Sequence, residues 1–247
     1  MPRMTLTPAT DPHLTTSFLS EDIEDIIRTR SVSNVVLSSC LDIPVAPQQI
    51  LADWQRETAH NLALAPGDVE EIPLARTRMR WPEYARCVQA MLNWTSTAGL
   101  PGVLAAGDLS LMACRGARYH HDSAQYSHSA FCNLFLGEDA GWDVHFPAID
   151  LRIPLSRGTA MVFDTGQPHG VIRRGSKGFD VADFAREDDA SQVFLSWEIP
   201  IEDPLVATAL GIRFNVDGNE VHPSDMGALL RNSVPTFLCA DTGVWLA

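Results

Sequence analysis

The feature that most constrains this fold is a series of short apolar or alternating segments between residues 103 and 200. Clusters of Gly, Pro, Asp and Ser separate these segments from one another. The segments are DLSLMAC, AFCNLFLG, WDVHF, IDLRIPL, TAMVFD, HGVIR and QVFLSWEIPI. Evenly spaced short strands with turn residues between them are typical of an antiparallel sandwich or barrel, so the pattern predicts a β core of about 100 residues.

The chain outside this core carries mainly helical patterns. SEDIEDIIRTR has Ser20 at an N-cap position, acids in the first turn and arginines at its end, which predicts a short amphipathic helix. A strand is expected at 33–39, and helices are expected within 47–64 and 81–102. A further short helix is expected after Ser224.

The length and composition favour one domain. The chain has 247 residues, of which 45% are hydrophobic and 20% are charged, the balance of an ordinary globular protein. We predict a flexible polar arm at 1–16 and a single domain at 17–247. Within that domain we expect a helical support at 17–102, the β core at 103–200 and a C-terminal extension at 201–247.

Charge and cysteine content exclude several classes of partner. The formal net charge of −13 would repel phosphate backbones and anionic membrane surfaces. The 5 cysteines are scattered and form no CxxC pair, which favours free thiols in a reducing compartment. The first residues have no signal-peptide run, and nowhere do about 18 apolar residues follow one another. We therefore expect a cytoplasmic protein that binds a small molecule and neither nucleic acid nor membrane; the oligomeric state stays open.

One stretch, RYHHDSAQYSHSAF at 118–131, is rich in histidine. Residues two apart on a strand point to the same face, so His120 and Asp122 can point inward together while His121 points away. His169, on a distant predicted strand, can supply a third ligand. Two imidazoles and a carboxylate leave coordination positions open, as in non-haem iron(II) oxygenases, whereas a structural zinc site fills its four positions with protein ligands. Taken singly, each residue more often belongs to a polar loop or a core; the three together in this strand context favour a metal site.

In this order the motifs resemble a known family. LMACRG, YHHD, FCNLFLG, EDAGWDVHFP, RGTAMVFD, PHGV and FLSWEIP follow one another as in the iron(II)/2-oxoglutarate-dependent oxygenases, near their prolyl-hydroxylase-like members. The resemblance covers Leu109 to Pro200. It implies a fold that is mainly β with α, in which a double-stranded β-helix (jelly-roll, cupin-like) core carries a helical N-terminal layer. It also implies Fe(II) on the catalytic residues His120, Asp122 and His169, with 2-oxoglutarate and O2 as co-substrates.

The resemblance further implies a cation that binds the distal carboxylate of 2-oxoglutarate, and here the sequence departs from the family. The usual place, near the start of the last strand, reads EDDASQVF and has no cation after Arg186. Arg173 shares a strand face with His169 and is expected to point into about the right volume. Arg173 and Arg186 are equal candidates, followed by Arg174 and Lys177, since a guanidinium fits a carboxylate better than an ammonium does.

Other polar residues have weaker claims on the pocket. Asn133 and Arg115 lie on predicted strands that would flank it, and they either contact 2-oxoglutarate or face solvent. His121 and His128 are candidates for substrate binding, with an exposed position as the alternative. Asp122 favours hydroxylation over halogenation, because related halogenases replace this carboxylate with a small residue; desaturation and ring formation stay open.

Three functions are compatible with these residues. The first is an Fe(II)- and 2-oxoglutarate-dependent dioxygenase that hydroxylates an unactivated C–H bond of an amino acid, small peptide or secondary metabolite. The second is a cupin-type metalloenzyme that does not use 2-oxoglutarate, which is favoured if no arginine lines the pocket. The third is a barrel without catalysis that binds a small ligand.

Overall fold

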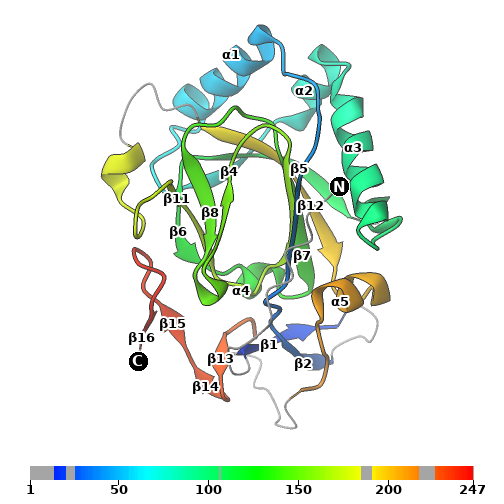
Figure 1. The fold of residues 1–247 in the computed structure, drawn as a ribbon, viewed down its shortest axis with the longest axis vertical. Coiled ribbons are helices and arrows are strands. Elements are labelled where there is room, and N and C mark those ends of the chain that lie inside the picture. Colours follow the sequence, from blue (N-terminus) through cyan, green and yellow to red (C-terminus); the bar gives the residue numbers. More distant parts are fainter. Residues whose placement is uncertain (1–13, 21–25, 106, 185–190, 217–225, 247) are drawn as a thin grey trace.

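The structure, a computed structural model, describes residues 14–20, 26–105, 107–184, 191–216 and 226–246. This part of the chain is mainly β, and its sheets are antiparallel (Figure 1). All 5 cysteines are free. Within the described ranges, no helix has the length and apolar character needed to cross a membrane.

The predicted β core consists of consecutive strands from β5 to β12, and all the segments predicted as strands form them. They are β5 (Asp108–Cys114), β6 (Ala117–His120), β7 (Ser129–Phe135), β8 (Trp142–Phe146), β9 (Leu151–Pro154), β10 (Thr159–Asp164), β11 (His169–Arg173) and β12 (Gln192–Pro200). Only β6 was not among the predicted apolar runs, and it leads into the histidine-rich stretch.

These strands form two sheets. The larger, 6-stranded sheet has the order β3-β10-β7-β12-β5-β4, and the smaller, 4-stranded sheet has the order β6-β11-β8-β9. β3 (Val36–Cys40) and β4 (Val69–Ile72) extend the larger sheet at its two edges. Figure 1 shows the two sheets facing each other. Side chains from both sheets line one cavity in the central space between them.

Alternation along the strands of the larger sheet separates two hydrophobic layers. In β12, Leu195 and Trp197 belong to the cluster that contains Ile50 of α1 and Met91 of α3. The alternate residue Phe194 belongs to a second cluster, between the two sheets. The helices of the described chain are α1 (Gln48–Arg56), a π-helix (Glu57–Asn61), α2 (Leu74–Arg80), α3 (Tyr84–Thr97), α4 (Ser123–Tyr126), α5 (Pro204–Leu210) and short 3-10 turns at Val103–Ala105, Pro147–Ile149 and Val181–Phe184.

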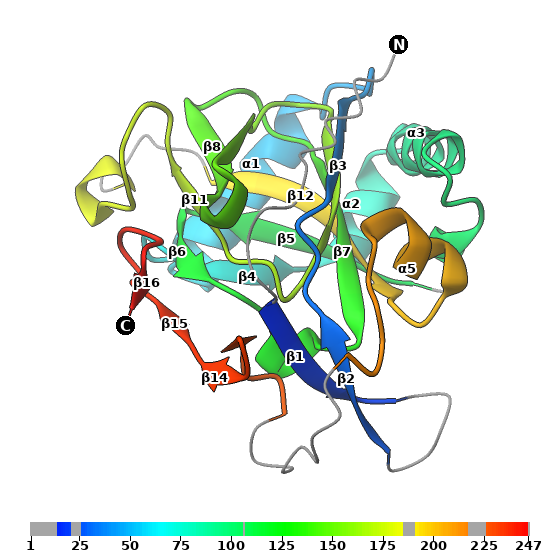
Figure 2. The same cartoon turned by 60° about the horizontal axis from the view of Figure 1, so that its bottom comes forward.

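The predicted helix from Ser20 to Arg30 is wrong in the described residues. β1 (Leu14–Leu19) and β2 (Ile27–Ser31) form an antiparallel pair instead, as Figure 2 shows, and 21–25 lie outside the described residues. The predicted arm also ends earlier than expected, because β1 begins at Leu14; residues 1–13 are not described. Helical spacing and caps are local signals, and here pairing between distant segments overrides them.

The remaining predictions outside the core have mixed outcomes. Helices form within 47–64 and 81–102, and the strand expected at 33–39 is β3. The first hundred residues are nevertheless not a purely helical support, because β3 and β4 belong to the larger sheet.

The C-terminal part also differs from the prediction. The helix expected after Ser224 does not form over the residues that are described, where the strands are β13 (Leu230–Arg231), β14 (Val234–Pro235), β15 (Phe237–Leu238) and β16 (Trp245–Leu246). The sequence analysis missed α5, although Asp203 caps it by accepting a hydrogen bond from the Leu205 N–H at 2.8 Å and Pro204 stands in its first turn.

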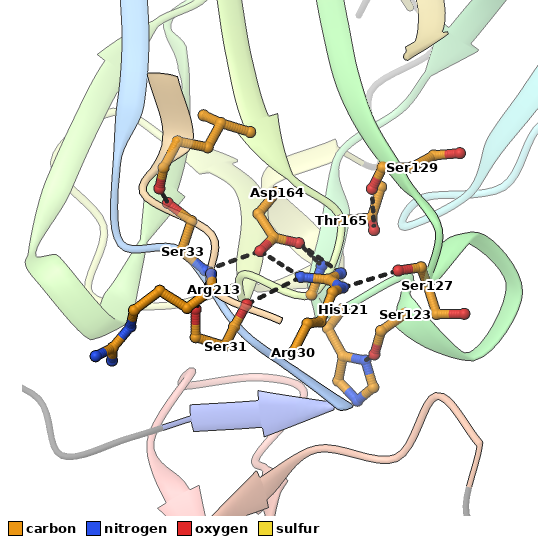
Figure 3. A network of polar contacts seen from close by, with 12 residues as sticks. Arg30, Ser31, Ser33, His121, Ser123, Ser127, Ser129, Asp164, Thr165 and Arg213 are labelled. Atoms are coloured by element: carbon orange, nitrogen blue, oxygen red, sulfur yellow. Dashed lines mark hydrogen bonds and ion pairs between the residues drawn. The ribbon is translucent and has the colours of Figure 1, made fainter. Parts of the chain in front are cut away.

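A buried ion pair joins the β1–β2 hairpin to the core. Arg30 contacts Asp164 through two parallel bonds of 2.7 and 2.8 Å, and both side chains are 0% exposed (Figure 3). Asp164 also accepts hydrogen bonds from the main-chain N–H groups of Ser33 and Gly166. The Arg30 guanidinium donates to the carbonyl oxygen of Ser127, in the segment after α4. Three separate parts of the chain therefore meet at one bidentate pair.

Replacing Arg30 with Met is expected to lower the free energy of unfolding by about 3–5 kcal/mol, because Asp164 would keep a buried charge without its partner. Arg28→Met is the matched control on the same strand. Its ion pair with Glu202 keeps partial contact with solvent, so the expected loss is smaller than for Arg30→Met. Urea denaturation of both variants measures the difference, and equal losses would contradict the role of the buried pair.

Candidate metal centre

The three predicted metal ligands lie together at one end of the central space. His120 ends β6 and His169 begins β11, and the two residues are cross-strand partners. The Asp122 carboxylate lies between them, with its oxygens 3.6 Å from the Nε2 atom of each histidine. One potential ligand atom from each residue lies within 4.8 Å of the others. The order of strands in the smaller sheet thus brings His169 to the HxD motif, although 47 residues separate it from Asp122.

Main-chain carbonyl groups set the orientation of both imidazoles. The Nδ1 atom of His120 lies 2.6 Å from the carbonyl oxygen of Arg118, and that of His169 lies 3.0 Å from the carbonyl oxygen of Gln167. A carbonyl oxygen only accepts, so each Nδ1 carries the hydrogen and each Nε2 keeps its lone pair. Both Nε2 atoms face Asp122, which is the arrangement that a metal ion requires of histidine ligands.

The environment of His169 keeps its ring neutral. Burial lowers its pKa to about 4, and the neighbouring His120 adds to this effect, while Asp122 opposes it. The rings of Phe163 and Phe146 lie 4.9 and 6.0 Å from the His169 ring, centroid to centroid. A neutral imidazole is the form that binds a metal, so no proton has to be removed near neutral pH.

The position of Asp122 depends on the segment that follows β10. Its main-chain N–H donates to the carbonyl oxygen of Thr165 at 2.8 Å. The Thr165 hydroxyl shares its hydrogen between the carbonyl oxygens of Tyr126 (2.7 Å) and Ser129 (2.8 Å). Thr165 directly follows Asp164, so the network in Figure 3 continues to the metal centre.

A cavity of about 460 Å³ opens beside the three ligands. Both sheets line it, and its apolar wall includes Met112, Phe131, Met161, Phe163 and Phe194. Cavities of this size hold small molecules. The three ligands therefore border a space in which an organic substrate can lie next to a bound metal.

Neither Arg173 nor Arg174 reaches this cavity. The Arg173 side chain is 55% exposed and pairs with Asp183 at 3.8 Å. Arg174 forms ion pairs with Asp139 and Asp143, whose carboxylates raise its pKa. The shared strand face does not help Arg173, because it lies at the last position of β11, beyond the end of the cavity.

The remaining candidates for the 2-oxoglutarate anchor do not place a cationic side chain in the cavity lining either, as far as the structure describes them. Lys177 is exposed and does not line the cavity, and Arg186 lies outside the described residues. Arg115 donates to main-chain carbonyl groups instead of facing the cavity. Over the part of the chain that the structure describes, the cavity lining contains no lysine or arginine.

The other predicted polar residues divide into two groups. Asn133 lines the cavity, and its buried Oδ1 atom has no hydrogen-bond partner among the described residues. His121 and His128 do not line it. The Nδ1 atom of His121 lies 2.8 Å from the Ser123 hydroxyl, beside the Arg30 network in Figure 3.

The sequence analysis missed an acidic side of the cavity. Glu198 on β12 and Glu70 and Glu71 on β4 all contribute to its lining. One signal was available for Glu198, since it continues the face of Phe194 and Ser196 in FLSWEIP, where the alternation places a charge on an inward position. No comparable signal existed for β4, which was not predicted as a strand.

Comparison with solved structures finds matches at low sequence identity. No family model and no curated protein matches the chain. A Pseudomonas putida prolyl-4-hydroxylase is 16% identical with a TM-score of 0.40, over 67% of this chain and 92% of that one. A viral collagen prolyl hydroxylase from Paramecium bursaria Chlorella virus-1 is 10% identical with a TM-score of 0.38, over 67% and 94%. The non-haem α-ketoglutarate-dependent epimerase SnoN of nogalamycin biosynthesis is 11% identical with a TM-score of 0.35, over 83% and 92%.

The buried His169 predicts a pH dependence of stability in the metal-free protein. Its pKa falls from 6.5 to about 4 on folding, so the unfolded chain binds the proton more readily. Stability should be full above about pH 6.5 and decrease by about 3 kcal/mol as the pH falls towards 4. Urea denaturation across this range checks the slope. His169→Asn should be less sensitive to pH, and an unchanged slope in that variant would contradict the assignment.

Proposed function

We propose that this chain is a mononuclear iron(II) oxygenase that oxidises a small molecule, with strands β5 to β12 forming a double-stranded β-helix. The observation that supports this most is the geometry of His120, Asp122 and His169, whose donor atoms converge beside a cavity. Iron(II) bound there would activate dioxygen for oxidation of an unactivated C–H bond.

The donor set suits a catalytic metal better than a structural one. Two imidazoles and one carboxylate supply three protein ligands, and in the described residues no further His, Cys, Asp or Glu joins this cluster. A structural zinc site would fill its coordination sphere with four protein ligands. The side of the site that faces the cavity thus stays available for co-substrate and dioxygen.

The chain's own residues have distinct tasks in this proposal. The carbonyl oxygens of Arg118 and Gln167 hold the two imidazoles with Nε2 facing Asp122. Phe131 and Phe163 give the cavity an apolar wall that excludes water from the reacting region. Hydroxylation is the oxidation we favour, since the carboxylate at Asp122 keeps one coordination position occupied by protein.

2-Oxoglutarate is the proposed co-substrate, and Arg186 is the predicted anchor that the described geometry leaves open. A second candidate is a cupin-type metalloenzyme that does not use 2-oxoglutarate. One specific observation favours it: the described cavity lining has three glutamates besides Asp122 and no arginine or lysine, whereas a dicarboxylate needs a cationic partner. A non-catalytic barrel is less favoured because the three ligands are oriented for a metal.

Anaerobic titration with iron(II), with and without 2-oxoglutarate, separates these functions. If 2-oxoglutarate chelates the metal, a weak visible absorption band should appear when both are present and not with either alone. Iron binding without this band would favour the cupin-type metalloenzyme. Failure to bind iron(II) at all would contradict both enzymes and leave a ligand-binding barrel.

Asp122→Ala is expected to weaken iron(II) binding by at least about 100-fold, since losing a residue that merely orients a ligand already costs roughly 10–100-fold. Succinate release coupled to substrate oxidation should disappear with it. His121→Gln is the matched control, because His121 is the neighbouring residue and does not line the cavity. Undiminished turnover in the Asp122 variant would overturn the assignment of the metal ligands.

A further inference from the structure

On the larger sheet, the part of the cavity lining next to the apolar wall is acidic. Glu198 on β12 and Glu71 on β4 line the cavity together with Glu70, and the metal ligands lie on the facing sheet. Glu71 pairs in register with Met112, which itself lines the cavity, so the two glutamates lie on the same side of the sheet. Glu198 and Glu71 therefore border, together with Glu70, a cavity whose described lining contains no lysine or arginine.

Among the described residues, no lysine or arginine pairs with Glu198. It is half-buried, and no hydrogen bond or ion pair connects its carboxylate to another described side chain. Burial raises its pKa, and the charges of Asp108 and Glu71 raise it further, while His128 opposes them. A cation beside Glu198 would relieve the repulsion among these acids.

Asn133 gives a second, independent observation. Its side chain is 7% exposed and lines the cavity, and its Oδ1 atom has no hydrogen-bond partner among the described residues. Asn133 is the cross-strand partner of Ser196, which lies two positions before Glu198 on the same face of β12. A buried acceptor without a donor is unfavourable, so this oxygen is suited to a ligand N–H group.

A second metal ion is a poor explanation for these acids. Across the described residues, the only group of three or more His, Cys, Asp and Glu side chains that could hold a metal ion is His120, Asp122 and His169. The glutamates belong to no such group, so an organic cation suits them better. A protonated amine or a guanidinium also offers several N–H donors, which carboxylates and an amide oxygen can share.

We propose that the substrate carries a cationic side-chain group, a protonated amine or a guanidinium, which Glu198 and Glu71 bind as carboxylates and Asn133 binds through its carbonyl oxygen. The remainder of the molecule extends along the apolar wall towards the metal ligands. This assignment deepens the proposed function, since it names the substrate class for the same cavity, but the binding it describes needs neither iron nor turnover.

Calorimetric titration with matched amino-acid pairs tests the charge requirement directly. L-Arginine and L-citrulline have nearly the same shape and differ in side-chain charge, and L-lysine and L-norleucine form a second pair of cation and neutral analogue. At least one cation should bind about tenfold or more tightly than its neutral analogue, as expected for a charge-assisted hydrogen bond. A panel in which no cation binds more tightly than its analogue overturns the proposal.

Three variants locate the preference in the cavity. Glu198→Gln and Glu71→Gln should each weaken binding of the preferred cation by about tenfold while leaving the neutral analogue unaffected. Glu83→Gln is the control, because Glu83 is exposed just before α3 and does not line the cavity. A cation preference that survives in both cavity variants overturns the proposal. Glu71 is exposed on an edge strand, so the Glu71→Gln variant supplies a test even if the Glu198 variant does not fold.

Manganese(II) binding, measured by electron paramagnetic resonance on the same proteins, distinguishes failure of this proposal from failure of the proposed function. Loss of metal binding with a retained, Glu198-dependent cation preference would refute the oxygenase and support the cationic ligand. Tight metal binding without any cation preference would support the metal centre and refute the cationic substrate.

Discussion

The bidentate contact between Arg30 and Asp164 is the interaction on which the metal centre depends. It fixes the end of β10, and two main-chain carbonyl groups in the residues that follow hold the candidate ligands in place. One, from Thr165, holds the main chain of Asp122, and the other, from Gln167, orients His169. A hairpin far from the ligands in sequence thus controls their alignment, because a buried charge pair tolerates little displacement.

The core and the position of the candidate metal ligands were predictable from sequence because their signals are local or periodic. Alternation identified every predicted strand from β5 to β12. The HxD motif brings His120 and Asp122 together, although Asp122 lies past the end of β6, at the N-cap of α4. The segment after Ser20 failed for the opposite reason. Its caps and isoleucine spacing are those of a helix, but Arg30 pairs with a residue 134 positions away, which no local pattern reveals.

The sequence predicted which residues share a strand face better than it predicted where along the strands the cavity ends. Alternation correctly relates His169 to Arg173, but it does not tell where along β11 the cavity ends. Likewise, Glu198 and Glu71 lie on strands that are not hydrogen-bonded to each other and that meet only because β5 lies between them. Both properties arise from the order and length of strands in the assembled sheets, which no segment encodes by itself.

The cross-strand position of His120 and His169 has a mechanical consequence. β6 is at the edge of the smaller sheet, and its pairing with β11 is short and shifts in register between His169 and Val171. A metal ion bound to both histidines would cross-link the two strands at this weak edge. Metal binding and the ordering of β6 would then be one coupled equilibrium, in which the ion stabilises the pairing of β6 with β11 in addition to taking part in catalysis.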